Sequence, residues 1–314
     1  MTREILQKII DDFSDNSPLN YLAGRGTAVG GTAPTQEDIE KNNYARDNLK
    51  DRGITPDMLG ADEESGLKGM RFFGRPVFSV ANADDPGFAE IKKAEAVGSH
   101  HLLPQDWLPG AKSVISVFLP IERATVEANK ADPVEPALAW LYTRVDGQRF
   151  LLAMGTAVRD AFIADGFMAV TPYTEEKYVM QVSRDLAPGT EHVPPYSTNW
   201  SERHVGVVTG LGTFGMSTNF ISKVGCAGRL ISVVTDWETK PDGHDYDDWL
   251  GYCNRCGACI RRCPAKAHFP DRHGKDHSLC GAFIRKVCEK YSPRYGCGKC
   301  QSGIPCEYQP MKPK

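Results

Sequence analysis

The chain has 314 residues, of which 41% are hydrophobic and 25% charged, and its formal net charge is −3. This composition is typical of a soluble globular protein, and the length is sufficient for one large domain and one small domain. The slight acidic excess argues against general nucleic-acid binding, which relies on a basic surface. The most apolar run, residues 113–120, is far shorter than the ~20 residues of a membrane-spanning helix. The N-terminus reads as an amphipathic helix rather than an export signal, so we expect a cytoplasmic protein.

Hydrophobic periodicity and turn residues predict the first elements of the chain. A helix is expected near residues 3–13, followed by a glycine-rich loop at 24–31 and a charged helix at 36–52. The loop lacks the Gly-Lys-Ser/Thr ending of a phosphate-binding loop. A buried strand is expected at 113–119, since a Pro-Gly turn precedes it and Pro120 closes it.

A second group of elements completes a large first domain. Residues 150–163 are predicted to form a helix that ends at Gly166, with strands at 167–170 and 229–235. The helix is indicated by apolar residues at helical spacing: Phe150, Leu151, Met154, Val158 and Phe162. The alternation of helices and buried strands predicts an α/β layered domain over residues 1–238. Residues 238–248, rich in Asp with a Pro and a Gly, are the expected linker to a small domain at 239–314.

Nine of the ten cysteines lie in the small domain. Cys253, Cys256, Cys259 and Cys263-Pro264 form the C-x2-C-x2-C-x3-C-P run of bacterial ferredoxins. Three thiolates at this spacing can wrap one cubane, and the fourth is turned away to ligate another. The sequence therefore predicts a ferredoxin-like domain with two 4Fe–4S clusters. The first is assigned Cys253, Cys256, Cys259 and Cys306, and the second Cys263, Cys280, Cys297 and Cys300.

Zinc is the alternative ligand for some of these thiols, since two C-x2-C pairs could form a tetrahedral site. That arrangement leaves Cys259, Cys263 and Cys306 without a role. Cys226 and Cys288 are expected to be buried structural thiols, with Cys288 a possible replacement for Cys280 as a ligand. Three histidines of the small domain are expected at the surface: His268, His273 and His277.

A glycine motif, G-x-G-x-x-G at Gly210–Gly215, has three interpretations. It could be a dinucleotide fingerprint, because Asp236 follows about 20 residues later, where a ribose-binding acid would stand. Residues 216–225 are β-branched and polar, however, and make a poor crossover helix. The other interpretations are a turn that allows close packing and a turn whose backbone meets another flat cofactor.

Three segments together resemble the epoxyqueuosine reductase and reductive dehalogenase superfamily. They are Ser201–Ser217, Gly228–Asp236 and the cysteine region, and the stretch from Trp107 fits as well. The resemblance implies a nitroreductase-like domain that binds cobalamin in its base-off form, beside the ferredoxin-like domain. The clusters would pass electrons to the corrinoid. The implied cofactor contacts are Glu202, Arg203, His204, Gly210, Leu211, Gly212, Thr213, Phe214, Gly215 and Met216.

The reductive chemistry also needs a proton donor, which the resemblance places near a Tyr-x-Arg segment. Here that segment is Tyr142-Thr-Arg144-Val-Asp146, and Asp146 is out of register with the family pattern. A second departure is the interval from Cys300 to Cys306, which is wider than the interval expected for the family. Tyr142 or Asp146 is the candidate donor, and Arg144 would orient a polar substrate. Helix capping is the structural alternative for Asp146, and Glu202, Arg203 and His204 are alternative catalytic residues.

These features predict an oxidoreductase, a cobalamin-dependent iron–sulfur reductase of a small molecule or modified nucleoside. Its electrons would come from a low-potential donor of the ferredoxin or flavodoxin type. One alternative is an electron-transfer protein that reduces a partner such as a corrinoid protein. Another is an NAD(P)-linked iron–sulfur oxidoreductase.

Overall fold

The computed structural model describes residues 1–26, 55–182, 196–271 and 274–311. The charged helix expected at 36–52 and most of the loop at 24–31 lie outside these ranges. A four-stranded sheet in the order β1-β2-β8-β3 occupies the centre, and every neighbouring pair is antiparallel. Its strands are β1 (Val77–Asn82), β2 (Ser113–Pro120), β8 (Gly228–Thr235) and β3 (Ala169–Val170). The mixed α/β class predicted from the sequence is confirmed.

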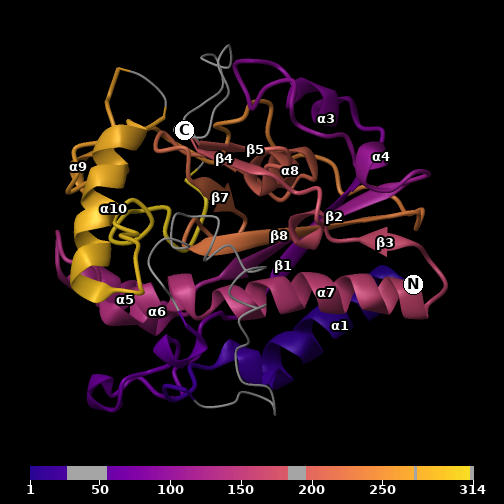
Figure 1. The fold of residues 1–314 in the computed structure, drawn as a ribbon. Helices are drawn as coiled ribbons and strands as arrows, with labels where there is room; N and C mark the ends of the chain where they lie inside the picture. Colours follow the sequence, from indigo (N-terminus) through magenta and orange to yellow (C-terminus); the bar gives the residue numbers. More distant parts are fainter. Residues whose placement is uncertain (27–54, 183–195, 272–273, 312–314) are drawn as a thin grey trace.

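Both faces of the sheet are covered, which explains the continuous apolar runs of its central strands. β2 and β8 pair along their full length, from Ser113 opposite Thr235 to Pro120 opposite Gly228. Helices α1 (Arg3–Asn16) and α7 (Gln148–Ala164) lie on one side, and α8 (Glu202–Val208) lies on the other (Figure 1). The predicted strands at 113–119 and 229–235 and the helices at 3–13 and 150–163 thus match β2, β8, α1 and α7.

Shorter elements surround this core. Two small antiparallel hairpins pair β4 (Met180–Val182) with β5 (Tyr196–Thr198) and β6 (Gly212–Phe214) with β7 (Phe220–Ser222). The other helices of the described ranges are α3 (Pro86–Glu90), α4 (Pro104–Trp107), α5 (Arg123–Ala131), α6 (Leu138–Val145), α9 (Ala258–Arg261) and α10 (His277–Tyr291). Single 3₁₀ turns are Pro18–Asn20, Pro56–Met58, Glu63–Ser65 and Pro172–Thr174.

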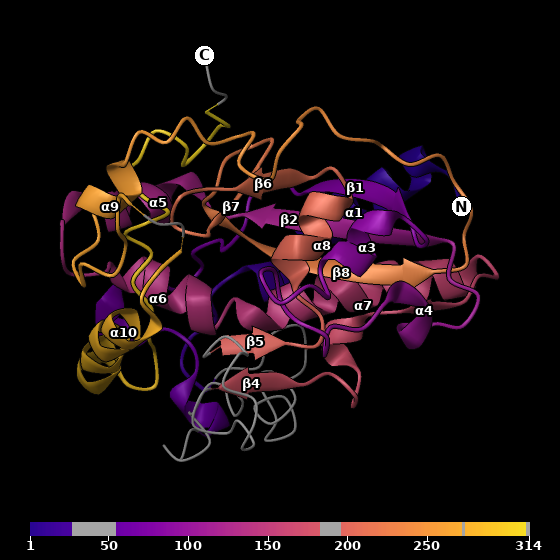
Figure 2. The ribbon, with the colours of Figure 1, turned by 90° about the horizontal axis from the view of Figure 1, so that it is seen from above.

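The cysteine-bearing segment packs against one end of the sheet domain. Both views place α10 beside α6 (Figures 1 and 2), and Lys290 Nζ and the Tyr291 hydroxyl at the end of α10 donate to the Glu135 carboxylate just before α6. Lys299, fully buried, donates from Nζ to the carbonyls of Asn129 at 2.6 Å and of Asp132 and Glu135 at 2.8 Å. Next to it, Gly298 has φ +69, and a Cβ there would overlap the indole of Trp140. Glycine therefore allows the 297–300 turn to lie flat on α6.

The expected linker is fastened to the first domain. The Asp242 carboxylate accepts hydrogen bonds from the backbone N–H of Val80 at 2.8 Å and from Arg3 Nη2 at 2.6 Å. Farther along, His244 Nε2 and the Tyr246 hydroxyl contact the carbonyls of Val208 and Val207 at the end of α8. This stretch is thus a strap along the sheet domain, and the boundary at residue 238 stays a prediction.

Within the described ranges, the search for a helix long and apolar enough to cross a membrane finds none.

Candidate functional site

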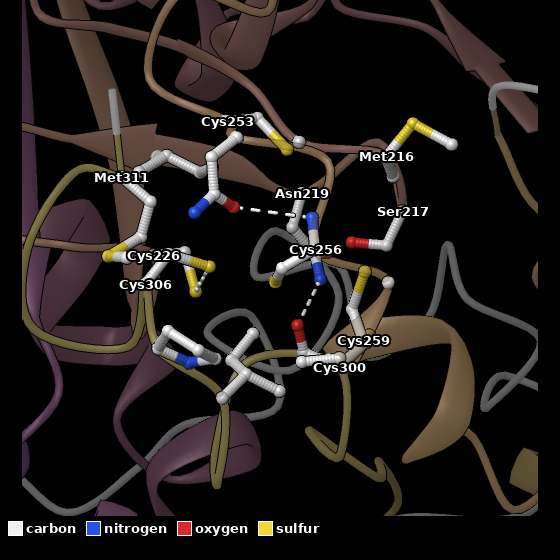
Figure 3. Close-up of a pocket in the computed structure, with 17 residues that line it drawn as sticks. Met216, Ser217, Asn219, Cys226, Cys253, Cys256, Cys259, Cys300, Cys306 and Met311 are labelled. Carbon is white, nitrogen blue, oxygen red and sulfur yellow. Dashed lines mark hydrogen bonds between the residues drawn. The ribbon is translucent and has the colours of Figure 1, made fainter. Parts of the chain in front are cut away.

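The cysteines form two adjoining groups. One cavity is lined by six of them, whose labelled side chains surround a common space in Figure 3: Cys226, Cys253, Cys256, Cys259, Cys300 and Cys306. A second and much larger cavity is lined by five: Cys263, Cys280, Cys288, Cys297 and Cys300. Cys300 therefore stands between the groups. The sequence-based ligand sets for the two clusters fall on different cavities, apart from this shared residue.

Local backbone geometry turns the first group inward. Arg255 adopts φ 56 and Gly257 φ 72, so the chain reverses twice between Cys253 and Cys259 before entering α9. The fourth cysteine of the run, Cys263, is directed away to the large cavity, and its Sγ accepts the backbone N–H of Ala267 at 3.3 Å. Hydrogen bonds of this kind to thiolate sulfur tune the potential of iron–sulfur clusters.

The arrangement bears on the zinc alternative. Among the described residues, no three His, Cys, Asp or Glu side chains converge as they would around a single metal ion. The two C-x2-C pairs also separate, because Cys253 and Cys256 line the first cavity whereas Cys297 lines the large one. A single tetrahedral site made from both pairs does not match this placement.

Helix α10 carries two of the thiols. Asp276 caps its N-terminus by accepting the N–H of Leu279 at 2.9 Å, which places Cys280 in the first turn. Cys288 lies two turns later and is buried in an apolar cluster with Leu59 and Val145, although it also borders the large cavity. Its apolar neighbours fit the packing role expected from the sequence.

The large cavity has a volume of about 1640 Å³ and is lined by residues of both the cysteine segment and the sheet domain. Typical sites for drug-sized ligands measure ~300–1,000 Å³, so this space suits a larger group. Its walls come from β2 and β8, α6, the β4–β5 hairpin, α8 and α10. Representative lining residues are Phe118, Leu230, Trp140, Met180, His204 and Phe283.

The glycine motif does not form a strand–turn–helix unit. Gly210 follows the end of α8, and Gly212 begins β6, which pairs with β7 in a hairpin. The Rossmann fingerprint requires a helix after the glycines, with its N-terminus at the pyrophosphate. The dinucleotide interpretation is therefore wrong for this segment. A Cβ at Gly210 or at Gly212 would overlap the carbonyl oxygen of Gly243 or of Ile221, which supports the interpretation as a turn for close packing. The interpretation as a turn next to another cofactor stays a prediction.

The predicted cofactor contacts divide into three sets. Glu202, Arg203, His204 and Phe214 line the large cavity, and Gly215 and Met216 line the thiol cavity. Four others line neither of these two cavities: Gly210, Leu211, Gly212 and Thr213. Leu211 packs in an apolar cluster, and Thr213 Oγ1 accepts the N–H of Tyr252 at 2.9 Å. The contacts of these four residues are thus packing contacts, and their role at a corrinoid stays a prediction.

Glu202 is the most unusual titratable group of the large cavity. Both of its carboxyl oxygens are buried, and neither forms a hydrogen bond with a described residue. Burial raises the pKa of this carboxyl to about 8, and nearby Ser232 offsets part of that effect. Glu202 is therefore a neutral acid near pH 7. The adjacent His204 Nδ1 shares a hydrogen bond with Ser201 Oγ at 2.8 Å.

The predicted catalytic trio is split by the fold. Asp146 is buried, and its carboxylate receives Arg294 Nε at 2.9 Å, Arg294 Nη2 at 3.1 Å and the N–H of Gly60 at 2.7 Å. The Arg294 guanidinium also lies over the Tyr142 ring at 4.1 Å. Among the described residues that line the large cavity, Arg144 is present but Tyr142 and Asp146 are not. Their surroundings indicate a structural role, and the sequence-based choice of donor stays a prediction.

Several residues of the site carried too little sequence signal to be found. Cys226 lines the thiol cavity although it was expected to be a packing residue, and His268 and His277 line the large cavity although they were expected at the surface. Lys299 lies between Cys297 and Cys300, and a lysine between two predicted cluster ligands could have been recognised from the sequence as part of the site. Arg294 had no such sequence signal, because its partner Asp146 lies 148 residues away.

Comparison with known proteins gives structural matches alone. No protein-family model matches the chain, and no curated protein does. The fold is similar to a selenomethionine-labelled epoxyqueuosine reductase, with TM-score 0.44, 16% identity and 76% of this chain covered. It is also similar to the Streptococcus thermophilus epoxyqueuosine reductase, with TM-score 0.38, 17% identity and 76% of this chain covered. A third similar structure is the catabolic reductive dehalogenase NpRdhA, with TM-score 0.43, 12% identity and 98% of this chain covered. The chain spans 65% of both reductases and 36% of the dehalogenase.

Proposed function

We propose that this protein is an iron–sulfur oxidoreductase in which two 4Fe–4S clusters supply electrons to a corrinoid bound in the large cavity. One observation carries the proposal. The motif cysteines form two groups that share Cys300, and the second group opens into a cavity of about 1640 Å³. Clusters bound by these two groups of cysteines would therefore lie next to a space large enough for a cofactor and its substrate.

The donor sets fit the proposed groups. Four thiols for each cluster, with a backbone N–H directed at Cys263 Sγ, match the ligation of a 4Fe–4S centre. The large cavity combines aromatic walls with polar side chains, as cofactor sites do. When bound, the clusters would supply single electrons and the corrinoid a low-valent metal for reduction.

The chain's own residues would handle the substrate and its proton. Glu202 replaces Tyr142 and Asp146 as the proposed proton source, because it borders the cavity and burial keeps it protonated near pH 7. Arg144 also borders the cavity, and its guanidinium lies over the Tyr295 ring at 4.7 Å. It would orient a polar or anionic substrate, either a small molecule or a modified nucleoside.

The first thiol group would receive the electrons. Cys256 is exposed, and exposed Arg255 and Arg261 stand beside it, with Arg261 Nη1 donating to the Cys256 carbonyl at 3.0 Å. A low-potential carrier of the ferredoxin or flavodoxin type with an acidic face would complement this charge. Cys263, by contrast, is buried at the large cavity. The direction of transfer would therefore run from Cys256 towards Cys263.

Cofactor content tests the proposal. Protein purified without oxygen should hold about eight iron atoms per chain, and titration with cob(II)alamin should give a stoichiometric change in the visible spectrum. Cys280→Ala should lower the iron content, whereas Cys288→Ala, on the same helix, should retain it. Full iron without cobalamin binding would refute the corrinoid assignment and favour an electron-transfer protein. Absence of iron from the wild type would refute the proposal entirely.

A further inference from the structure

The turn between β7 and β8 brings a thiol of the first domain into the cluster cavity. Cys226 donates its N–H to the Cys306 carbonyl at 2.9 Å, and its own carbonyl accepts Gln301 Nε2 at 2.8 Å. Gly225, with φ +97, lies so close to the backbone of Glu307 that a Cβ would clash with its carbonyl. The turn is therefore built to lie against the last cysteine loop.

The side chain of Cys226 completes this contact. Its Sγ lies 3.8 Å from Cys306 Sγ, and both residues line the cavity with Cys253, Cys256 and Cys259 (Figure 3). A cubane has four irons and takes one cysteine at each. The cavity thus offers one more thiol than the three motif cysteines and Cys306 require, even without counting the shared Cys300.

The surroundings of Cys226 favour a neutral thiol over a second thiolate. The residue is 1% exposed and packs with Ile221, Tyr252 and Ile304. An additional buried anion in this apolar setting, next to an anionic ligand, would be strongly unfavourable. A thiol can instead direct its proton at the neighbouring sulfur, because S–H groups are weak donors.

We propose that Cys226 is a positioning and tuning residue, which donates an S–H hydrogen bond to the Cys306 thiolate when that sulfur binds the first cluster. Reduction adds negative charge to the cluster and its ligands, so a donor at a ligand sulfur stabilises the reduced form. Hydrogen bonds to the sulfurs are among the factors that set cluster potentials. Cys226 thereby raises the potential of the first cluster. The inference rests on the proposed function in that a cluster must bind there.

The experiment compares Cys226→Ala, Cys226→Ser and the control Ser222→Ala in the full-length holoprotein. Ser222 belongs to the same turn, and its Oγ donates to the Gly225 carbonyl at 2.8 Å rather than to a sulfur. Iron content and the midpoint potentials of both clusters are measured by anaerobic redox titration followed by electron paramagnetic resonance. These measurements need neither substrate nor cobalamin.

All variants should retain about eight iron atoms per chain. Cys226→Ala should make reduction of one cluster less favourable by up to tenfold, which is a fall of about 59 mV for one electron. The other cluster should be unchanged. Cys226→Ser keeps a donor and should lie closer to the wild type, and Ser222→Ala should leave both potentials in place.

Two results would overturn the inference while leaving the proposed function intact. A fall to about four iron atoms in both Cys226 variants would make Cys226 a ligand rather than a donor. Equal potentials in the wild type and Cys226→Ala would reduce its role to packing. Absence of iron from the wild type is a separate outcome, which refutes the proposed function and this inference together.

Discussion

Asp146→Asn removes the negative charge that faces the buried guanidinium of Arg294. The side chains of the two residues are 7% and 6% exposed, so solvent does little to screen the loss. Asparagine can still accept the Gly60 N–H, which the carboxylate holds at 2.7 Å. The variant therefore tests the loss of the charge together with the loss of the acceptor that faces Arg294 Nε. Breaking a buried ion pair from one side costs about 3–5 kcal/mol of unfolding free energy, and we expect a loss in that range.

The assay is urea denaturation of the wild type, Asp146→Asn, Arg294→Met and the double variant. The double variant should lose less than the sum of the single losses, because neither charge is left buried without its partner. Asp15→Asn is the matched control. Asp15 pairs with Arg71 at 2.8 Å but is 65% exposed, and its removal should cost no more than about 1 kcal/mol.

The same variant separates the structural role from the catalytic role suggested by the sequence. If Asp146 were the proton donor, Asp146→Asn would abolish turnover and leave the unfolding free energy near that of the wild type. That outcome, or additive losses in the double variant, would refute the interpretation of Asp146 as half of a buried clamp between α6 and the segment after α10.

Three further predictions concern protons, partners and docking. The folded-state pKa of Glu202, about 8, exceeds the ordinary 4.5, so folding takes up a proton between these values. In urea titrations, the unfolding free energy of the wild type relative to that of Glu202→Gln should therefore fall by about 1.4 kcal/mol per pH unit as pH rises from 5.5 to 7, with a slope about half as steep at pH 8. His101, whose pKa burial lowers to about 3, destabilises both proteins equally as pH falls through 6.5, so its effect cancels in this difference. Arg255→Glu with Arg261→Glu should slow reduction by an acidic ferredoxin at least tenfold in stopped-flow measurements at low salt, and equal rates would refute docking at Cys256. Lys299→Met removes the ammonium that donates to the carbonyls of Asn129, Asp132 and Glu135. Arg262 Nη2 also donates to the first two of these carbonyls, so the loss in urea denaturation should be about 1–3 kcal/mol, with unchanged stability as the contrary result.

Local pattern was sufficient for the elements of the core. The apolar runs at 113–119 and 229–235 appear as β2 and β8, and the helical spacing from Phe150 to Phe162 appears in α7. Each of these signals is contained within one element and depends on which face is buried. The mixed α/β class followed from them.

Contacts between distant segments were beyond the sequence. Helix α8 was not predicted, because Val205, Gly206, Val207 and Val208 are weak helix formers, and packing on the sheet overrides their preference. The glycine motif after it kept a dinucleotide interpretation open because periodicity did not show the hairpin partner of β6. Asp146 looked catalytic because Arg294 is remote in the chain.

The buried cations show how the two parts of the site depend on one another. Lys299 and Arg294 belong to the cysteine segment, and their side chains donate hydrogen bonds to backbone carbonyls of the first domain. Lys299 donates to the carbonyl of Asn129 and Arg294 to that of Gly60. A buried ammonium is unfavourable unless hydrogen bonds and a nearby anion compensate it. Lys299 has its three carbonyls, and its neighbours in sequence are Gly298 and Cys300, with Cys297 two residues away. Thiolates that bind iron would supply the compensating charge. Cluster binding should therefore stabilise the docked arrangement as well as carry electrons, since folding and ligation of a metal group are linked.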